Sequence, residues 1–203
     1  MKRVDPGFDE LRLERVGAAI ITDIERERYD GAALFVGRRG QVALREAWGF
    51  ADRAAGRELS VDDPFFTMSL GKQFTVAVVL NRVERGQLAL RMRIAEIIPE
   101  FGKGGKERIT LAQLLTHTSG VVAMLPPIPP GDISNLEEFV AAICESPAEA
   151  MPGERVHYSV LAGHAVMAEV VRRVDGRTRS FREIIQDDLF SDHSGIAREP
   201  PLP

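Results

Sequence analysis

The sequence has few of the residues that would mark several protein classes. It contains one cysteine in 203 residues, which excludes an internal disulfide and a cysteine-based metal cluster. That residue, Cys144, lies among apolar residues at helical spacing, so we expect a small core side chain rather than a nucleophile. No segment could span a membrane, and the N-terminus lacks the apolar stretch of a signal peptide. We therefore expect a cytoplasmic protein with no membrane partner.

Blocks of one charge are also missing. The chain has 26 Lys and Arg and 30 Asp and Glu, with a net charge of −4, and the two signs are interspersed. This pattern gives no support to nucleic-acid binding. His157, His164 and His193 have no recognisable metal spacing, and we expect neither a metal nor an organic cofactor. At 44% hydrophobic and 28% charged, the composition is that of an ordinary globular protein with one sizeable core.

The first third of the chain predicts a helix and a hairpin. Apolar residues recur at helical spacing among charges over residues 8–28, which indicates an amphipathic helix. Residues 31–36 and 41–48 are typical of two strands, joined by a tight turn at residues 37–40. A two-stranded hairpin is only marginally stable alone and leaves an unpaired edge. We expect a second copy of the chain, a partner chain or rearranged packing to cover that edge.

Beyond Pro64 the pattern becomes helical. The apolar periodicity predicts helices over residues 69–85, from 110 to about 116, and 160–174. Ser134 and Ser180 each begin a capping box before a further apolar run. The proline-rich segment at residues 124–131 predicts an extended surface loop.

Ser69-Leu-Gly-Lys72 is the motif with the clearest chemistry. Side chains three residues apart on a helix share a face, so the Lys72 amine can reach the Ser69 hydroxyl. Serine is a poor nucleophile until a base accepts its proton, and a lysine desolvated against apolar walls can help. If Ser69 begins the helix, the helix dipole also favours negative charge there. The alternative interpretation is a capping serine beside a surface lysine.

Two more motifs follow at characteristic spacing. These are Leu114-Leu-Thr-His-Thr-Ser-Gly120 and Pro152-Gly-Glu-Arg-Val-His-Tyr158-Ser159. In order and spacing, the three motifs resemble the serine β-lactamase superfamily. That group includes class C β-lactamases, D,D-peptidases and β-lactamase-like carboxylesterases. The resemblance extends over residues 8–190.

The resemblance implies roles for three residues. Ser69 would be the acylated nucleophile, Lys72 its base partner and Tyr158 a second proton-handling group. The Ser69 N–H would form half of the oxyanion hole. For Tyr158 the alternative is a half-buried tyrosine bonded to a backbone carbonyl. His117 suggests a general base, but we expect His117 and Ser119 to hydrogen-bond backbone at a helix end.

Two departures from the family pattern affect the functional prediction. The family motif reads Tyr-x-Asn, and this sequence has Val160 in place of the asparagine. A valine side chain forms no hydrogen bond. Esterase members often carry an apolar residue there. The sequence also ends at Pro203 without the Lys-Thr-Gly type of motif found near the C-terminus of the family. We therefore expect a relative that lacks the C-terminal part of the family pattern, as a fragment, a natural truncation or a shifted-frame product, with an atypical Pro-rich tail at residues 191–203.

The sequence as a whole predicts an α+β fold. Residues 1–66 would form the helix and hairpin of an incomplete α/β layer, and residues 67–190 a mainly helical domain carrying the motifs. The expected function is a serine hydrolase that acts through an acyl-enzyme on carboxylic esters. The alternatives are a truncated, non-catalytic relative that binds a ligand or partner, and a β-lactamase or D,D-peptidase. The expected substrate is a small-molecule ester or amide.

Overall fold

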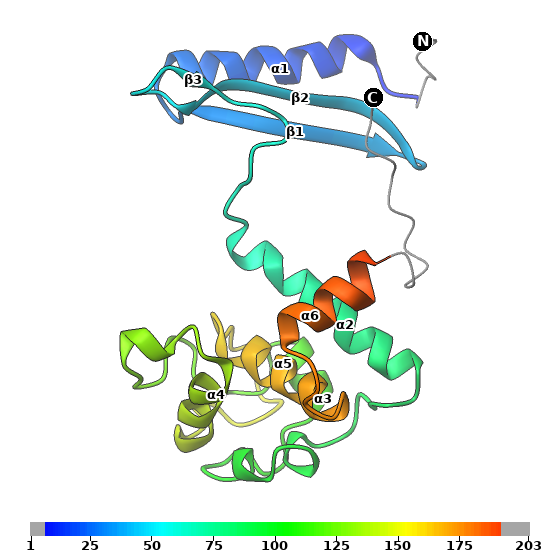
Figure 1. Cartoon of the computed structure of the whole chain (residues 1–203), viewed down its shortest axis with the longest axis vertical. Coiled ribbons are helices and arrows are strands. Elements are labelled where there is room, and N and C mark those ends of the chain that lie inside the picture. Colours follow the sequence, from blue (N-terminus) through cyan, green and yellow to red (C-terminus); the bar gives the residue numbers. More distant parts are fainter. Residues whose placement is uncertain (1–6, 192–203) are drawn as a thin grey trace. The chain divides into compact units, whose positions relative to one another are not determined.

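The chain forms two compact units in the computed structural model, Met1–Phe66 and Thr67–Pro203 (Figure 1). The structure describes residues 7–191, so the predicted tail lies, apart from Ser191, outside the described residues. Helices and a small antiparallel sheet together make an α+β fold, as the sequence predicts. Each unit has its own secondary structure and is described separately.

The first unit consists of one helix and three strands. Helix α1 (Glu10–Glu25) is followed by β1 (Gly31–Arg38), β2 (Gln41–Asp52) and β3 (Arg57–Glu58). The strands pair antiparallel in the order β1-β2-β3. The prediction of only two strands was incomplete, because β2 runs past Trp48 to Asp52 and the chain then turns back to form β3.

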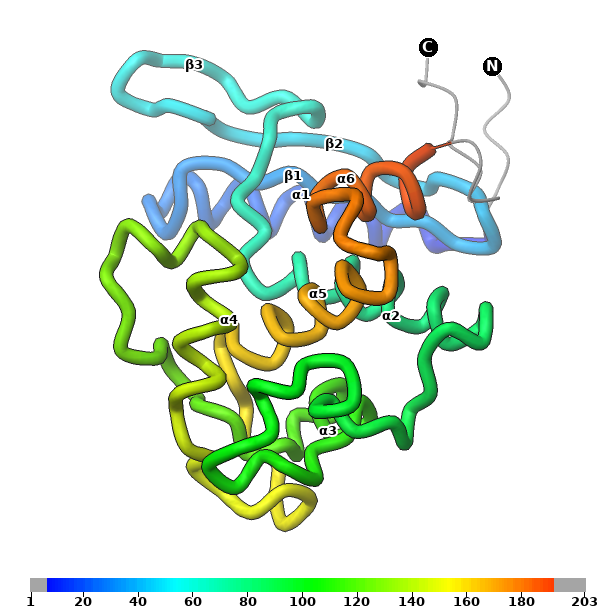
Figure 2. The backbone as a smooth tube through the Cα atoms, turned by 60° about the horizontal axis from the view of Figure 1, so that its bottom comes forward, coloured from blue at the N-terminus to red at the C-terminus, as the bar shows by residue number. Residues whose placement is uncertain are grey.

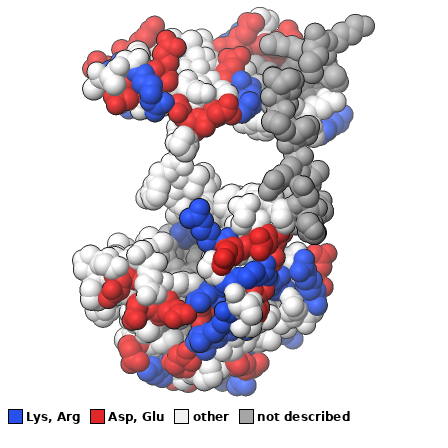
Figure 3. All heavy atoms as spheres, viewed as in Figure 1, with Lys and Arg blue, Asp and Glu red and all other residues white. Residues whose placement is uncertain are grey.

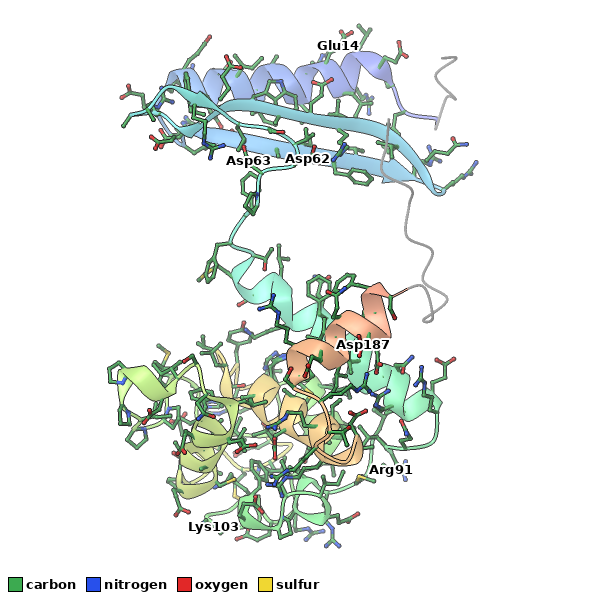
Figure 4. All side chains as sticks on the ribbon, in the orientation of Figure 1. Glu14, Asp62, Asp63, Arg91, Lys103 and Asp187 are labelled. Carbon is green, nitrogen blue, oxygen red and sulfur yellow. The ribbon has the colours of Figure 1, made fainter. Side chains whose placement is uncertain are left out.

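Helix α1 covers one face of this sheet (Figures 1 and 2). Gly17 makes the close approach possible, because a Cβ there would lie 3.3 Å from the Trp48 ring. On the segment after β3, Asp62 and Asp63 accept hydrogen bonds from Arg45 and Arg57 of the strands (Figure 4). These contacts hold the start of the connecting segment to the sheet.

One edge of the sheet is open in the described part of the chain. β1 pairs with β2 along one side, and no described strand pairs with its other side. Phe35, in the middle of β1, has 57% of its surface exposed. The unpaired backbone groups of such an edge can pair with another strand.

The second unit is helical and is built around α5. Its α-helices are α2 (Lys72–Glu84), α3 (Leu111–Leu115), α4 (Leu136–Glu145), α5 (Ala162–Val174) and α6 (Phe181–Ile185). Short 3₁₀ turns lie at Met68–Gly71, Ile94–Glu96, Pro99–Phe101 and Pro130–Asp132, and a π-helical turn at Gln186–Phe190. Val166, Met167 and Val171 of α5 are fully buried and join the core with Val78 of α2 and Ile143 of α4.

Helix starts in this unit follow local sequence signals. Thr110 and Ser180 form the capping boxes that begin α3 and α6, which confirms the predicted helix starts. The box predicted at Ser134 is wrong by one residue, because Asn135 accepts from the backbone at the start of α4. Residues 124–131 form no regular helix or strand beyond the 3₁₀ turn that begins at Pro130, as predicted. Cys144 is buried in the core, also as predicted.

Buried ion pairs connect the helices around α5. Glu169, which is only 2% exposed, accepts hydrogen bonds from Arg172, Arg173 and Arg177. Arg82 of α2 lies equally deep and contacts Asp175. A charge buried this deeply is tolerated only when it is paired. The Glu169 contacts lie within α5 and the residues just after it, whereas the Arg82–Asp175 contact fixes α2 against the end of α5. In the described part of the chain, no helix is long and apolar enough to cross a membrane.

Candidate active site

The structure brings Ser69, Lys72 and Tyr158 together in the second unit. Lys72 Nζ donates a hydrogen bond to Ser69 Oγ at 3.2 Å, and the Tyr158 hydroxyl lies 3.0 Å from the same atom. Lys72 Nζ is also 5.4 Å from the centre of the Tyr158 ring. The Ser69 hydroxyl therefore has two neighbours that can accept or return a proton.

The α-helix does not begin at Ser69, so the predicted helix over residues 69–85 is wrong at its start. Ser69 lies in the 3₁₀ turn Met68–Gly71, and α2 begins at Lys72. Met68 has a φ of 48°, a left-handed conformation that is uncommon for non-glycine residues and that is often found at functional sites. The tighter turn still places the Ser69 and Lys72 side chains on one side, three residues apart.

Tyr158 lies on an irregular segment just before α5. Backbone hydrogen bonds tie this segment to residues 117–123: His157 N donates to His117 O at 2.6 Å, and Val160 N donates to Ala123 O at 2.7 Å. The Ser159 hydroxyl is buried and accepts from Gly163 N at 3.1 Å. Ser159 therefore helps to begin α5, and Tyr158 is fixed from both sides.

Glu149 adds a side-chain connection between the same two segments. Its Oε2 accepts from Ala123 N and lies 2.9 Å from His157 Nε2. The backbone hydrogen bond from Ala123, together with His157, holds the pKa of Glu149 below its usual value. Sequence reasoning missed Glu149, because nothing near it in the chain indicates that it reaches residues 123 and 157.

His117 has a different role from the predicted backbone hydrogen bond. Its ring packs against the Tyr158 ring, with 4.6 Å between centroids, and its Nδ1 has no hydrogen-bond partner in the described part of the chain. His164 of α5 stands 5.7 Å from His117, centroid to centroid. Ser119 is buried and accepts from the Val121 N–H at 3.5 Å, in line with the expected structural role.

The electrostatics of the cluster favour proton transfer at Tyr158. Hydrogen bonds from Ser69 and Lys72 lower the pKa of Tyr158. Burial and the charge of Lys72 lower the pKa of His117. Burial, Lys72 and His117 together bring the pKa of His164 to about 4. Both imidazoles are therefore neutral near pH 7. The described residues contain no group of three or more His, Cys, Asp or Glu side chains that could hold a metal.

Exposed apolar side chains are common near the motifs. Met68 and Leu70 flank Ser69 in the chain. Met124 follows Ala123, whose carbonyl oxygen accepts from Val160 N. The side chains of Met68, Leu70 and Met124 are all more than 60% exposed. Figure 3 shows that the side of this unit formed by the proline-rich loop carries few charges, whereas charged side chains gather over α6. Apolar surface of this kind suits an uncharged ligand.

The Beta-lactamase family model matches residues 16–194 of the chain. The chain is 31% identical to Esterase EstB of Burkholderia gladioli, over 86% of this chain and 45% of that protein. It is 26% identical to Penicillin-binding protein 4 of Amycolatopsis lactamdurans, over 97% of this chain and 48% of that protein. The chain thus spans a little under half the length of these curated relatives.

The fold also matches solved structures. A family VIII carboxylesterase superposes with a TM-score of 0.77 at 26% identity, over 86% of this chain and 47% of the other. Two of these three relatives are named as esterases and one as a penicillin-binding protein.

Proposed function

The chain belongs to the Beta-lactamase family, and on this premise we propose that it is a serine hydrolase that cleaves carboxylic esters through an acyl-enzyme. Ser69 is the proposed nucleophile, and Lys72 and Tyr158 are the proposed proton carriers. The observation that supports this most strongly is the position of Ser69 Oγ, which is within hydrogen-bond distance of both Lys72 Nζ and the Tyr158 hydroxyl.

In the proposed reaction, Ser69 Oγ attacks the ester carbonyl carbon while its proton passes to Tyr158 or Lys72. The carbonyl π electrons move onto oxygen, and the Ser69 N–H is a proposed donor to this oxyanion. When the tetrahedral intermediate collapses, the C–O bond to the alcohol breaks and the alcohol takes the proton back. Water then attacks the acyl-enzyme with the same groups as base, releasing the acid and restoring the Ser69 hydroxyl.

An ester is favoured over a lactam because of Val160. Its backbone N–H is already bonded to Ala123 O, and its side chain offers no polar group to a substrate amide. The exposed side chains of Met124 and Leu125 come directly after Ala123. The surroundings of Val160 therefore suit an apolar ester group, and the relatives named as esterases agree with this preference.

Two other functions remain as alternatives. A β-lactamase or D,D-peptidase activity is suggested by the similarity to Penicillin-binding protein 4, but Val160 argues against it. A non-catalytic relative that binds a ligand or a partner would keep the geometry without turnover.

We also propose that a second copy of the chain pairs with the open edge of β1, because edge pairing would satisfy the free backbone groups.

Covalent labelling shows whether the protein is an enzyme or a non-catalytic relative. The intact mass is measured before and after reaction with a fluorophosphonate, and hydrolysis of a p-nitrophenyl ester is followed in parallel. We expect one adduct, which Ser69→Ala abolishes and which Ser134→Ala, at an exposed serine before α4, leaves intact. An adduct that persists in Ser69→Ala, or that maps to Ser119 or Ser159, would contradict the proposed nucleophile.

A further inference from the structure

Two histidines, His117 and His164, lie next to Tyr158 and have not yet been given a role. His117 follows α3, and His164 lies in the first turn of α5. The ring centroids are 4.6 Å apart for Tyr158 and His117, and 5.7 Å apart for His117 and His164. His164 is 9% exposed, whereas Tyr158 is 46% exposed. The three rings thus run from the surface into the core.

The inner part of this row carries polar atoms that form no hydrogen bond. Nδ1 of His117 and Nδ1 of His164 are both buried, and neither has a hydrogen-bond partner among residues 7–191. An unpartnered buried polar atom costs stability, and an apolar side chain of similar shape would avoid that cost. Core packing alone therefore does not account for two imidazoles at these positions.

His117 also holds Tyr158 through the backbone. Its φ of 54° is left-handed, and its carbonyl oxygen accepts from His157 N at 2.6 Å, one residue before Tyr158. One residue thus fixes both the chain next to Tyr158 and the face of the Tyr158 ring. His117 keeps an uncommon backbone conformation while its carbonyl contacts His157 and its ring contacts Tyr158. Such a conformation indicates that the position of this residue matters for the site.

We propose that His117 and His164 are positioning residues, which hold the Tyr158 ring so that its hydroxyl stays within hydrogen-bond distance of Ser69. The inference rests on the proposed role of Tyr158 as a proton carrier and adds two residues to that machinery. The hydrogen bonds to Ser69 Oγ come from Tyr158 and Lys72, and the two histidines act only through the tyrosine ring. His117 supports the tyrosine ring, and His164 supports His117 from within α5.

The charges around the pair agree with this role. Lys72 of α2, Tyr158 of the irregular segment and His164 of α5 are the titratable groups near His117. His157, the residue directly before Tyr158, pairs with Glu149. Burial and Lys72 lower the pKa of both inner histidines, so the rings stay neutral. Neutral rings support Tyr158 without placing a second positive charge beside Lys72.

A tyrosine titration tests the inference without any need for turnover. The sequence has two tyrosines, so Tyr29→Phe leaves Tyr158 as the only source of the phenolate absorbance. In this background His117→Ala should raise the pKa of Tyr158, because a displaced ring loses the hydrogen bonds that now lower it. His117→Phe, which keeps a ring at the same strained φ, should shift it less. His164→Ala should raise it in the same direction.

Labelling rates provide the second readout. With a fluorophosphonate, His117→Ala should react about 10- to 100-fold more slowly than the wild type, which is the scale for a misplaced catalytic group. His117→Phe should recover part of that rate. Thr116→Ala, which removes a hydroxyl from the same turn, controls for general damage to the turn.

The possible outcomes distinguish the two proposals. A wild type that is not labelled, together with the expected shift in the titration, contradicts the proposed function and supports the positioning role. An unchanged Tyr158 pKa in both His117→Ala and His164→Ala overturns the positioning role, whatever the activity. If His117→Ala does not fold, the same comparison is made between His117→Phe and His164→Ala.

Discussion

Ser69 Oγ and the Tyr158 hydroxyl lie 3.0 Å apart, although 89 residues separate them in the chain. The contact depends on the backbone hydrogen bonds that hold residues 157 and 160 to residues 117 and 123. Lys72 approaches the same hydroxyl from the start of α2. The proposed chemistry thus depends on one local contact and one distant contact.

Removing either proposed proton carrier should slow acylation strongly. Lys72→Met and Tyr158→Phe should each reduce the rate of ester hydrolysis about 100- to 10,000-fold, because a positioned acid or base contributes on that scale. The measurement is kcat and KM on a p-nitrophenyl ester. Lys103→Met is the matched control, since Lys103 pairs with Glu145 at the surface. Equal losses in Lys72→Met and Lys103→Met would point to a stability effect.

Substrate preference should change at Val160. We expect the wild type to hydrolyse short-chain aryl esters faster than nitrocefin, because the valine side chain offers no hydrogen bond to an amide. Val160→Asn should move the ratio of the two kcat/KM values toward nitrocefin. Leu161→Asn is a control for adding an amide one residue away. Faster turnover of nitrocefin by the wild type would reverse our substrate assignment.

Acid should destabilise the protein partly through His164. Its pKa is about 4 in the folded chain, against an ordinary value of 6.5. Between these two pH values the unfolded chain binds a proton that the folded chain does not. The free energy of unfolding should therefore decrease as the pH is lowered from about 6.5 to about 4, by at most about 3.4 kcal/mol from this group.

His164→Leu tests this pH dependence, because leucine cannot titrate. Urea unfolding is measured at several pH values between 7 and 4 for the wild type and the variant. The loss of stability in acid should be smaller for the variant, while the paired carboxylates contribute equally to both. Parallel curves would show that His164 takes up its proton as readily in the folded chain as in the unfolded one.

Self-association should depend on the open edge of β1. Light scattering should show association that increases with concentration, because an unpaired edge strand can pair with a second copy. Phe35→Lys should weaken it by placing like charges opposite each other. Leu11→Lys makes the same change at an exposed position of α1 and should have little effect. A wild-type protein that stays monomeric at high concentration would contradict the edge pairing.

Features that depend on neighbours in the chain were predictable from the sequence. Ser69 and Lys72 are three residues apart, so any helical turn at that point brings them together, even though the turn is 3₁₀ rather than α. The capping boxes at Thr110 and Ser180 are equally local. The start of α4 shows the limit, because Ser134 and Asn135 can both cap a helix and only the folded backbone selects Asn135.

Local sequence is enough to predict the Ser-x-x-Lys pair, most helix starts and the apolar face of α5, since each follows from interactions within about one helical turn. Tertiary packing, by contrast, is what brings the His117 ring against Tyr158, places His164 beside His117 and lets Glu149 reach Ala123 and His157. These contacts require distant segments to return to one place, and no local pattern encodes that return. Packing around α5 supplies it, by burying the apolar residues of α2, α3 and α4 against one helix.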